Sequence, residues 1–414
     1  MKEKIIQSLD DPQELEKLYR DNKSGFKKAF DLIYPENKQK LSVQFWHERL
    51  TSNSTGLNLG TSKELLFVLM ISLTAGLIAK IPHFTGFDEE IFYSRNIAFI
   101  IFPMLSVYFA WKQALQIKKI ALIAGIFIIS AVHVNFLPNN ENSDTLILAC
   151  IHLPLLLWAL TGFVFTGNHY KSFQKRIDFL RYNGDLVVMT AVTLIAGGIL
   201  SAVTVGLFKL IEIPIEEFYF KYVAIWGLAA APIVATYLVR SNPQLVQNVS
   251  PVIAKVFTPL VLIMITAYLI AIIYTGKDPY NDREFLMVFN ILLIGVMAII
   301  LFSVAESSDR KSNKTGILLL LALSVVTIIV NGIALSAIIF RITEWGITPN
   351  RIAVFGANIL ILMNLLLVTF KLFKSLRNSD ELQSVENSIA IFLPVYTGWT
   401  IIVVFLFPLL FNFQ

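Results

Sequence analysis

The chain has 414 residues, of which 56% are hydrophobic and only 15% charged, and its formal net charge is +5. A soluble domain carries about 25% charged residues, so this composition excludes an ordinary soluble protein. The small positive excess does not indicate nucleic-acid binding, and a single cysteine, Cys150, excludes an intramolecular disulfide. The apolar residues lie in blocks of about twenty, enough for a helix to cross a bilayer core of roughly 30 Å. We therefore expect an all-α, polytopic transmembrane helical bundle.

Residues 1–62 are polar and form the first predicted domain, a cytoplasmic amphipathic helical tail without a secretory signal. The segment Asp11-Pro12-Gln13-Glu14 offers an N-cap, a proline at the first helical position and a capping glutamate. Apolar residues then recur at helical spacing in three groups. They are Leu15, Leu18 and Tyr19; Phe26, Phe30 and Ile33; and Phe45, Trp46 and Leu50. We expect these stripes to pack onto the inner face of the bundle or, alternatively, onto a protein partner.

Residues 63–414 form the second predicted domain, the membrane bundle. About eleven spans are expected, although the second is short and opens on Arg95, so that its loss would leave ten. The spans are 64–80, 95–111, 119–137, 144–165, 185–209, 219–239, 251–275, 284–305, 316–340, 350–372 and 388–410. Fourteen Lys and Arg residues fall in alternate loops and span ends against eight in the others. By the positive-inside rule, the N-terminus is cytoplasmic and the C-terminus lies outside.

Small residues recur every four positions on the fifth and sixth spans. They are Gly198, Ala202 and Gly206 on the fifth, and Gly227, Ala231 and Ala235 on the sixth. Such stripes let helix backbones approach closely in lipid, so we expect these two spans to pack tightly against each other.

Five polar residues lie about four to nine residues from the outer ends of their spans, in one layer of the bilayer's outer half. They are His133, His152, Asn290, Asn331 and Asn358. Polar side chains at this depth usually face the bundle interior or a wet cavity. One hypothesis is therefore an outward-facing polar pocket. The alternative is that each residue simply hydrogen-bonds a neighbouring helix.

Recognisable catalytic motifs are missing from the sequence. No histidine pair has the spacing of a metal site, so neither a metal nor another cofactor is expected. There is no Gly-x-Ser-x-Gly, no Walker A loop and no Gly-x-Gly-x-x-Gly. Acids deep within the spans are absent as well, which disfavours a proton-driven pump. The sequence therefore favours a protein that is not an enzyme.

The loop from Arg341 to Arg351 joins two spans in about ten residues at the predicted outer interface. Gly346 permits a tight bend, Pro349 suits the first turn of the next helix, and Trp345 belongs in the interfacial belt. Arg341 and Arg351 are candidates to pair with Glu344 or with lipid phosphates. This loop is therefore either a rigid turn or a binding element.

Short motifs in the tail and in the 341–351 loop resemble those of a known family. The tail motifs are Leu18-Tyr19-Arg20, Tyr34-Pro35-Glu36 and Phe45-Trp46-His47-Glu48-Arg49-Leu50, and the loop motif is Trp345-Gly346-Ile347-Thr348-Pro349-Asn350-Arg351. The chain resembles uncharacterised bacterial multipass membrane proteins, catalogued as domain of unknown function number four-one-five-three. The resemblance implies a bacterial inner membrane and supplies no catalytic residue.

Three functions remain open after the sequence. The leading one is binding or movement of a small molecule or lipid through the polar pocket. The second is a non-catalytic membrane scaffold or sensor that docks a partner through its tail. The third is a membrane enzyme acting on lipid or isoprenoid, which would need a metal or an acid–base cluster.

Overall fold

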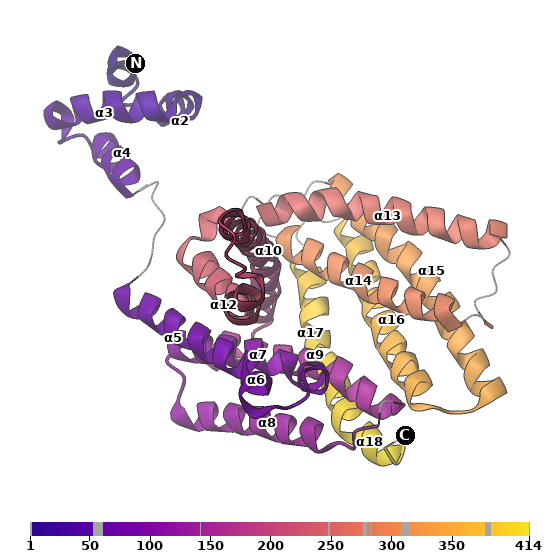
Figure 1. The fold of residues 1–414 in the computed structure, drawn as a ribbon. Helices are drawn as coiled ribbons and strands as arrows, with labels where there is room; N and C mark the ends of the chain where they lie inside the picture. The colour runs from indigo at the N-terminus through magenta and orange to yellow at the C-terminus, as the bar shows by residue number, and fades with distance from the viewer. Residues whose placement is uncertain are drawn as a thin grey trace. The chain divides into compact units, whose positions relative to one another are not determined.

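The structure is a computed structural model that describes residues 2–52, 61–140, 142–246, 249–275, 280–281, 283–307, 314–376 and 382–413. The chain forms two compact units, Met1–Asn58 and Leu59–Gln414. The sequence placed this division after residue 62. Each unit is described by itself, and Figure 1 identifies the helices of both.

The first unit consists of four helices, α1 (Lys2–Gln7), α2 (Pro12–Asp21), α3 (Lys23–Asn37) and α4 (Leu41–Ser52). The predicted N-cap of α2 is confirmed, because the Asp11 carboxylate accepts hydrogen bonds from the backbone N–H groups of Gln13 and Glu14 at 3.0 and 3.1 Å. These two bonds satisfy backbone N–H groups that the first turn of a helix cannot pair internally.

The three apolar groups of the first unit are buried against one another and form a core of their own. Phe26 and Trp46 are at the centre, with their ring centroids 5.0 Å apart. Phe45 departs from the predicted patch, because its side chain is 65% exposed while Trp46 and Leu50 are buried. On a helix, adjacent residues point about 100° apart, so Phe45 and Trp46 cannot share one face.

The second unit is a polytopic transmembrane bundle, and every predicted span coincides with a helical segment in it. Ten helices among the described residues are long and apolar enough to cross a membrane, and α14 contains a shorter apolar stretch. The helices are α5 (Ser62–Ala79), α6 (Ile81–Thr85), α7 (Glu89–Lys112), α8 (Ile117–Phe136), α9 (Asp144–Thr166), α10 (Phe173–Leu210), α11 (Glu216–Phe218), α12 (Ile225–Ser241), α13 (Val249–Thr275), α14 (Arg283–Ser307), α15 (Lys314–Trp345), α16 (Pro349–Ser375), α17 (Leu382–Ile401) and α18 (Phe407–Leu410).

Several helix boundaries differ from the predicted ones, as the second and fifth spans show. The short second span becomes the 24-residue helix α7, which begins at Glu89. Helix α10 begins twelve residues before predicted residue 185, because its polar first turns are also helical and bond neighbouring helices. In one such bond, Arg176 donates to the carbonyl of Ala390 at 2.9 Å. Hydropathy does not detect a helix that continues into polar sequence.

Two π-helical segments interrupt the regular helices. They are η2 (Tyr219–Ala224), which precedes α12, and η5 (Ile402–Leu406), which lies between α17 and α18. Neither was predicted. Short π-helical turns of this kind often occur at functional sites.

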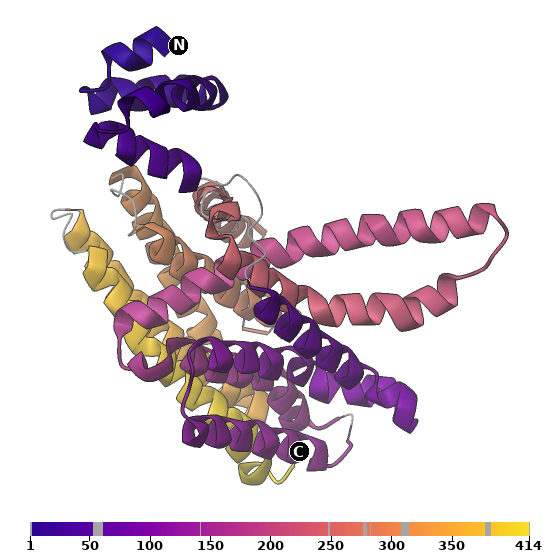
Figure 2. The ribbon, with the colours of Figure 1, turned by 90° about the vertical axis from the view of Figure 1, so that its left-hand side faces the viewer.

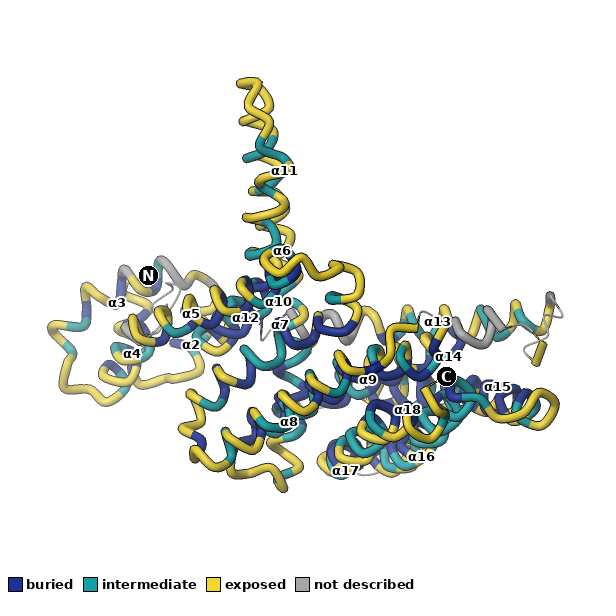
Figure 3. The backbone as a smooth tube through the Cα atoms, turned by 60° about the horizontal axis from the view of Figure 1, so that its bottom comes forward, coloured by how far each residue is buried: buried dark blue, intermediate teal, exposed yellow. Residues whose placement is uncertain are grey.

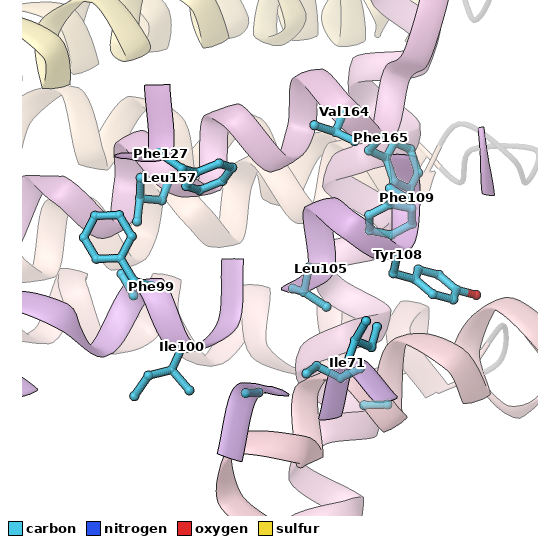
Figure 4. Packing of buried hydrophobic residues seen from close by; sticks show 14 of the residues in the cluster. Ile71, Phe99, Ile100, Leu105, Tyr108, Phe109, Phe127, Leu157, Val164 and Phe165 are labelled. Carbon is cyan, nitrogen blue, oxygen red and sulfur yellow. The ribbon is translucent and has the colours of Figure 1, made fainter. Parts of the chain in front are cut away.

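Two hydrophobic cores hold the second unit together, and α10 contributes to both. The first core joins α5, α7, α8, α9 and α12, and its aromatic centre includes Phe109 and Phe165, with ring centroids 5.0 Å apart (Figure 4). The second core joins α13 to α17. On α10, Phe179 and Tyr182 face the first core while Ile177 and Leu180 face the second. Helix α10 is therefore shared by the two cores, and Trp158 of α9 packs against both as well (Figure 1).

The later half of α10 and the α11–η2 segment that leads into α12 form a hairpin whose far end projects from the bundle (Figure 2). Its end, near α11, is mostly exposed in Figure 3. The small residues of the fifth span lie on this exposed part, and nothing comes within 4 Å of a Cβ placed on Gly198, Gly206 or Gly227. The predicted tight packing at these glycines was therefore wrong. The two helices pack closer to the bundle, where Tyr182 and Thr236 share a hydrogen bond of 2.7 Å.

Candidate functional site

Three of the five predicted pocket residues meet in the second core. Asn358 on α16 donates from Nδ2 to Oδ1 of Asn290 on α14 at 2.8 Å. Asn331 on α15 donates from Nδ2 to the backbone carbonyl of Asn358 at 3.2 Å. We call Asn290, Asn331 and Asn358 the asparagine layer. It connects three helices through side-chain amides.

Asn331 and Asn358 are buried, Asn290 is half-buried, and one acceptor of the layer is unsatisfied. Asn331 is 0% and Asn358 2% exposed. The Oδ1 atom of Asn331 is buried and accepts no hydrogen bond. A buried acceptor without a donor costs about 1–3 kcal/mol, so such a group in a native structure needs an explanation.

Further unsatisfied polar atoms lie on the helices beside Asn331. They are Oδ1 of Asn364 and Oγ1 of Thr369 on α16, and Nε1 of Trp399 on α17. Asn364 is 0% exposed, and its Nδ2 donates to the Tyr396 hydroxyl at 2.9 Å. The α15–α16–α17 region thus combines acceptors and a donor that the protein itself leaves without partners.

The two histidines do not join the asparagine layer. His133 on α8 bonds through Nε2 to the carbonyl of Val404 at 2.9 Å, in the π-helical segment η5. His152 on α9 bonds through Nδ1 to the carbonyl of Leu148, one turn earlier in its own helix, at 2.9 Å. Carbonyl oxygens only accept, so each of these nitrogens carries a hydrogen. The five residues were predicted at a similar depth in the membrane, but only the three asparagines contact one another.

The 341–351 loop is a turn organised by its arginines. Arg351 donates from Nη1 to the carbonyls of Trp345 and Gly346 at 2.8 and 2.6 Å. Arg341, 8% exposed, donates from Nε to the carbonyl of Tyr280 at 2.9 Å. Both guanidinium groups lie over the Trp345 ring, at 5.4 and 5.8 Å from its centroid. The described hydrogen bonds of the two arginines end on backbone carbonyls and order the turn.

Two features of this loop match the residue types that the sequence offered. Gly346 has φ of +78°, a left-handed conformation that favours glycine. Thr348 caps α16 by accepting a bond from the Arg351 N–H at 3.3 Å. Glu344 is exposed, and no ion pair of Glu344 with Arg341 or Arg351 is recorded among the described residues.

Two buried carboxylates escaped the sequence analysis because both lie near helix beginnings. Glu386 on α17 is 0% exposed and accepts from Nη2 of Arg181 on α10 at 2.8 Å. Arg181 also donates to the carbonyl of Ala305 near the end of α14. This ion pair therefore joins three helices, 15 residues or roughly 22 Å along α14 from Asn290.

The second buried carboxylate is Glu64, 5% exposed, in the first turn of α5. Its Oε1 accepts from the Tyr108 hydroxyl at 2.9 Å and from the Lys112 ammonium at 2.6 Å. Both donors are on α7, so Glu64 fixes the start of α5 to the end of α7. No group of three metal-ligating side chains occurs among the described residues, so neither buried carboxylate belongs to one.

Comparisons with protein families, with curated proteins and with solved structures found no match to this chain. The chemistry of the site must therefore be read from the residues alone. The asparagine layer offers neutral amides with an open acceptor. The Arg181–Glu386 pair and the Glu64 cluster are charge-compensated contacts between helices, which suit structural roles.

Proposed function

We propose that this protein binds a small uncharged molecule that donates hydrogen bonds, and moves it through the bilayer, at the asparagine layer. The observation that carries the proposal is the unsatisfied Oδ1 atom of Asn331, which is fully buried between α15 and α16. A ligand hydroxyl or N–H group would supply the missing donor.

The chemistry of the layer supports an uncharged ligand. Its three side chains are uncharged amides, and its described hydrogen bonds join amides and a backbone carbonyl, which suits an uncharged ligand. An unbalanced charge in a buried site costs several kcal/mol. The open acceptor of Asn364 and the open donor of Trp399 on the adjacent helices extend the region that a ligand would contact.

We further propose that the protein lies in a bacterial inner membrane, with the N-terminus cytoplasmic, the C-terminus outside and the asparagine layer nearer the outer face. The bias of Lys and Arg between alternate loops supports this orientation. The resemblance to the domain family of unknown function supports the bacterial membrane, and membership in that family is part of the proposal.

The alternative function is a non-catalytic scaffold or sensor that docks a protein partner through the tail. It is supported by two large apolar side chains on the same face of α4, Leu41 at 80% and Phe45 at 65% exposed. A membrane enzyme acting on lipid or isoprenoid is a weaker alternative, because the paired carboxylates Glu64 and Glu386 are each engaged by a cation.

Native mass spectrometry of the full chain, released from a mild detergent, tests the ligand proposal. We expect wild-type protein to carry a small molecule and Asn331→Leu to carry none. The Asn331→Leu variant should keep its thermal stability, because leucine has the same branching at Cγ and removes the unsatisfied polar atom. A wild-type protein without bound ligand, or an Asn331→Leu variant that retains it, would overturn the proposal.

Asn183→Leu is the matched control for this experiment. Asn183 is fully engaged, since it accepts from Trp158 Nε1 at 2.9 Å and donates to the carbonyl of Phe179. Leucine at position 183 leaves the Trp158 N–H without its partner, so this variant should lose stability and keep the ligand. A polypeptide bound to wild type instead of a small molecule would favour the scaffold alternative.

A further inference from the structure

Arg95 is a nearly buried cation whose hydrogen bonds end on neutral atoms. It lies on α7 and is 6% exposed. Its Nη1 donates to the carbonyls of Val134, Asn135 and Leu137 at 2.9, 3.3 and 3.0 Å. Its Nη2 donates to Oδ1 of Asn139 at 3.3 Å. No carboxylate pairs with this guanidinium among the described residues.

The charge of Arg95 is only partly balanced by its surroundings. The three carbonyls belong to the last turn of α8 and its C-cap, where the helix dipole is equivalent to about half a negative charge. Buried cations in proteins are normally paired with a full negative charge, because desolvation penalises an unpaired ion by several kcal/mol. Arg181, by contrast, faces the carboxylate of Glu386 at 2.8 Å.

The guanidinium is held in place by its neighbours rather than left to rotate. Asn96, the next residue on α7, exchanges two side-chain hydrogen bonds with Asn135, at 2.9 and 2.8 Å. This reciprocal amide pair fixes α7 against the last turn of α8. Arg95 therefore has the fixed position that a binding residue requires.

One edge of the guanidinium is open. Its four hydrogen bonds leave from Nη1 and Nη2, so that Nε keeps an N–H group without a protein acceptor. The Nη2 end reaches Asn139, an exposed residue, and Phe136 beside it is 83% exposed. The parallel N–H groups of Nε and Nη2 are the fork that binds phosphate or carboxylate in a bidentate manner.

We propose that Arg95 binds a phosphate group where the first turns of α7 pack against the last turn of α8, with Nε and Nη2 as donors. The phosphate comes from a lipid headgroup or from a free phosphate ion. The exposed ring of Phe136 beside the site offers an apolar contact that an acyl chain would use and a free ion would not. This site is independent of the asparagine layer, which lies on α14, α15 and α16.

The full chain purified in mild detergent is incubated separately with phosphatidylglycerol, with inorganic phosphate and with diacylglycerol, which lacks the phosphate. Bound lipid is measured by native mass spectrometry and stabilisation by thermal unfolding. We expect wild type to retain phosphatidylglycerol at least about tenfold more tightly than diacylglycerol. If inorganic phosphate raised the unfolding temperature as much as phosphatidylglycerol does, the site would be assigned to a free phosphate ion.

Two variants separate binding from helix capping. Arg95→Lys keeps the charge but lacks the bidentate fork, and Arg95→Gln removes both, so each should lose most of the preference for the phosphate. Arg351→Gln is the matched control, because Arg351 also donates to backbone carbonyls and should not affect the binding. Wild-type protein that treats the two lipids alike would overturn the proposal without any variant, and so would an unchanged preference in Arg95→Lys and Arg95→Gln.

Discussion

His133 donates a hydrogen bond to the carbonyl of Val404, which is the carbonyl that Pro408 leaves without an α-helical donor. The two partners are 271 residues apart in the chain, and Nε2 lies 2.9 Å from the carbonyl oxygen. In an α-helix, this carbonyl would accept from the N–H four residues later, but proline has none. Val404 lies in the π-helix η5, and the histidine from α8 donates to its carbonyl instead.

This arrangement predicts a rescue between distant positions. His133→Ala leaves the carbonyl of Val404, a fully buried residue, without its donor and should reduce the free energy of unfolding by about 1–3 kcal/mol. Pro408→Ala supplies a backbone N–H at the correct position, so the double variant should lose less than the sum of the two single losses. Reversible unfolding in mixed detergent micelles measures all four proteins. Additive losses would show that the carbonyl does not couple the two residues.

The Arg181–Glu386 ion pair should behave as a buried pair rather than a surface one. Glu386→Gln removes the buried carboxylate that faces Arg181 at 2.8 Å, leaves Asp178 at 3.6 Å, and should cost up to about 3–5 kcal/mol of stability. Replacing both residues with apolar ones, Arg181→Met with Glu386→Leu, should restore part of that loss. The same unfolding measurement reports all three variants.

Lys175→Gln is the control for the ion pair. It removes a pair with Asp178 whose side chains are 49% and 32% exposed, and should cost less than about 1 kcal/mol. If Glu386→Gln cost no more than this control, the pair would contribute little to holding α10, α14 and α17 together.

The fold was predictable from sequence because transmembrane helices are encoded locally. A block of about twenty apolar residues is sufficient for one span, and no partner needs to be known. The same argument explains the cap at Asp11, whose acceptor and donors lie within three residues. Prediction failed where the structure depends on residues that are distant in the chain. The polar first turns of α10 and the exposure of Gly198 depend on which other helices are present.

The site was predicted in part, for a related reason. Depth in the membrane is readable from position along a span, so Asn290, Asn331 and Asn358 were selected together. Rotation about the helix axis and the order of helices are not readable in this way, so His133 and His152 were included although they face other partners. Glu386 was missed because Arg181, its partner, lies 205 residues earlier in the chain.

The tail should lose stability in acid through Glu16. Hydrogen bonds from Arg20 and then Arg49 lower the pKa of Glu16 below its usual value of 4.5. A carboxylate with a lowered folded pKa contributes stability that is present above the unfolded pKa. That contribution is lost as the pH falls from about 4.5 through the lowered folded pKa. Hydrogen exchange of α2 and α4 in the full-length protein, measured against pH, should show protection falling in this window.

The Glu16→Gln variant provides the comparison for this acid effect. Glutamine does not titrate, so the variant should have weaker protection at neutral pH and a smaller fall below pH 4.5 than wild type. A fall of equal size in both proteins would assign the acid sensitivity to other carboxylates of the tail, such as Asp10, which pairs with Lys40 at 3.0 Å.

The close packing of α16 against α17 should require a glycine at position 356. A Cβ at this position would collide with the indole ring of Trp399, and a ring has no flexible end that can move aside at low cost. Gly356→Ala should therefore reduce the free energy of unfolding by about 1–3 kcal/mol, as overpacked cores do. Gly332→Ala on α15 is the control, because nothing lies within 4 Å of its added Cβ and alanine favours the helix. The control should unfold no earlier than wild type. If Gly356→Ala matched it, the ring of Trp399 would have room to move, and the close approach of α16 to α17 would not be a requirement of the fold.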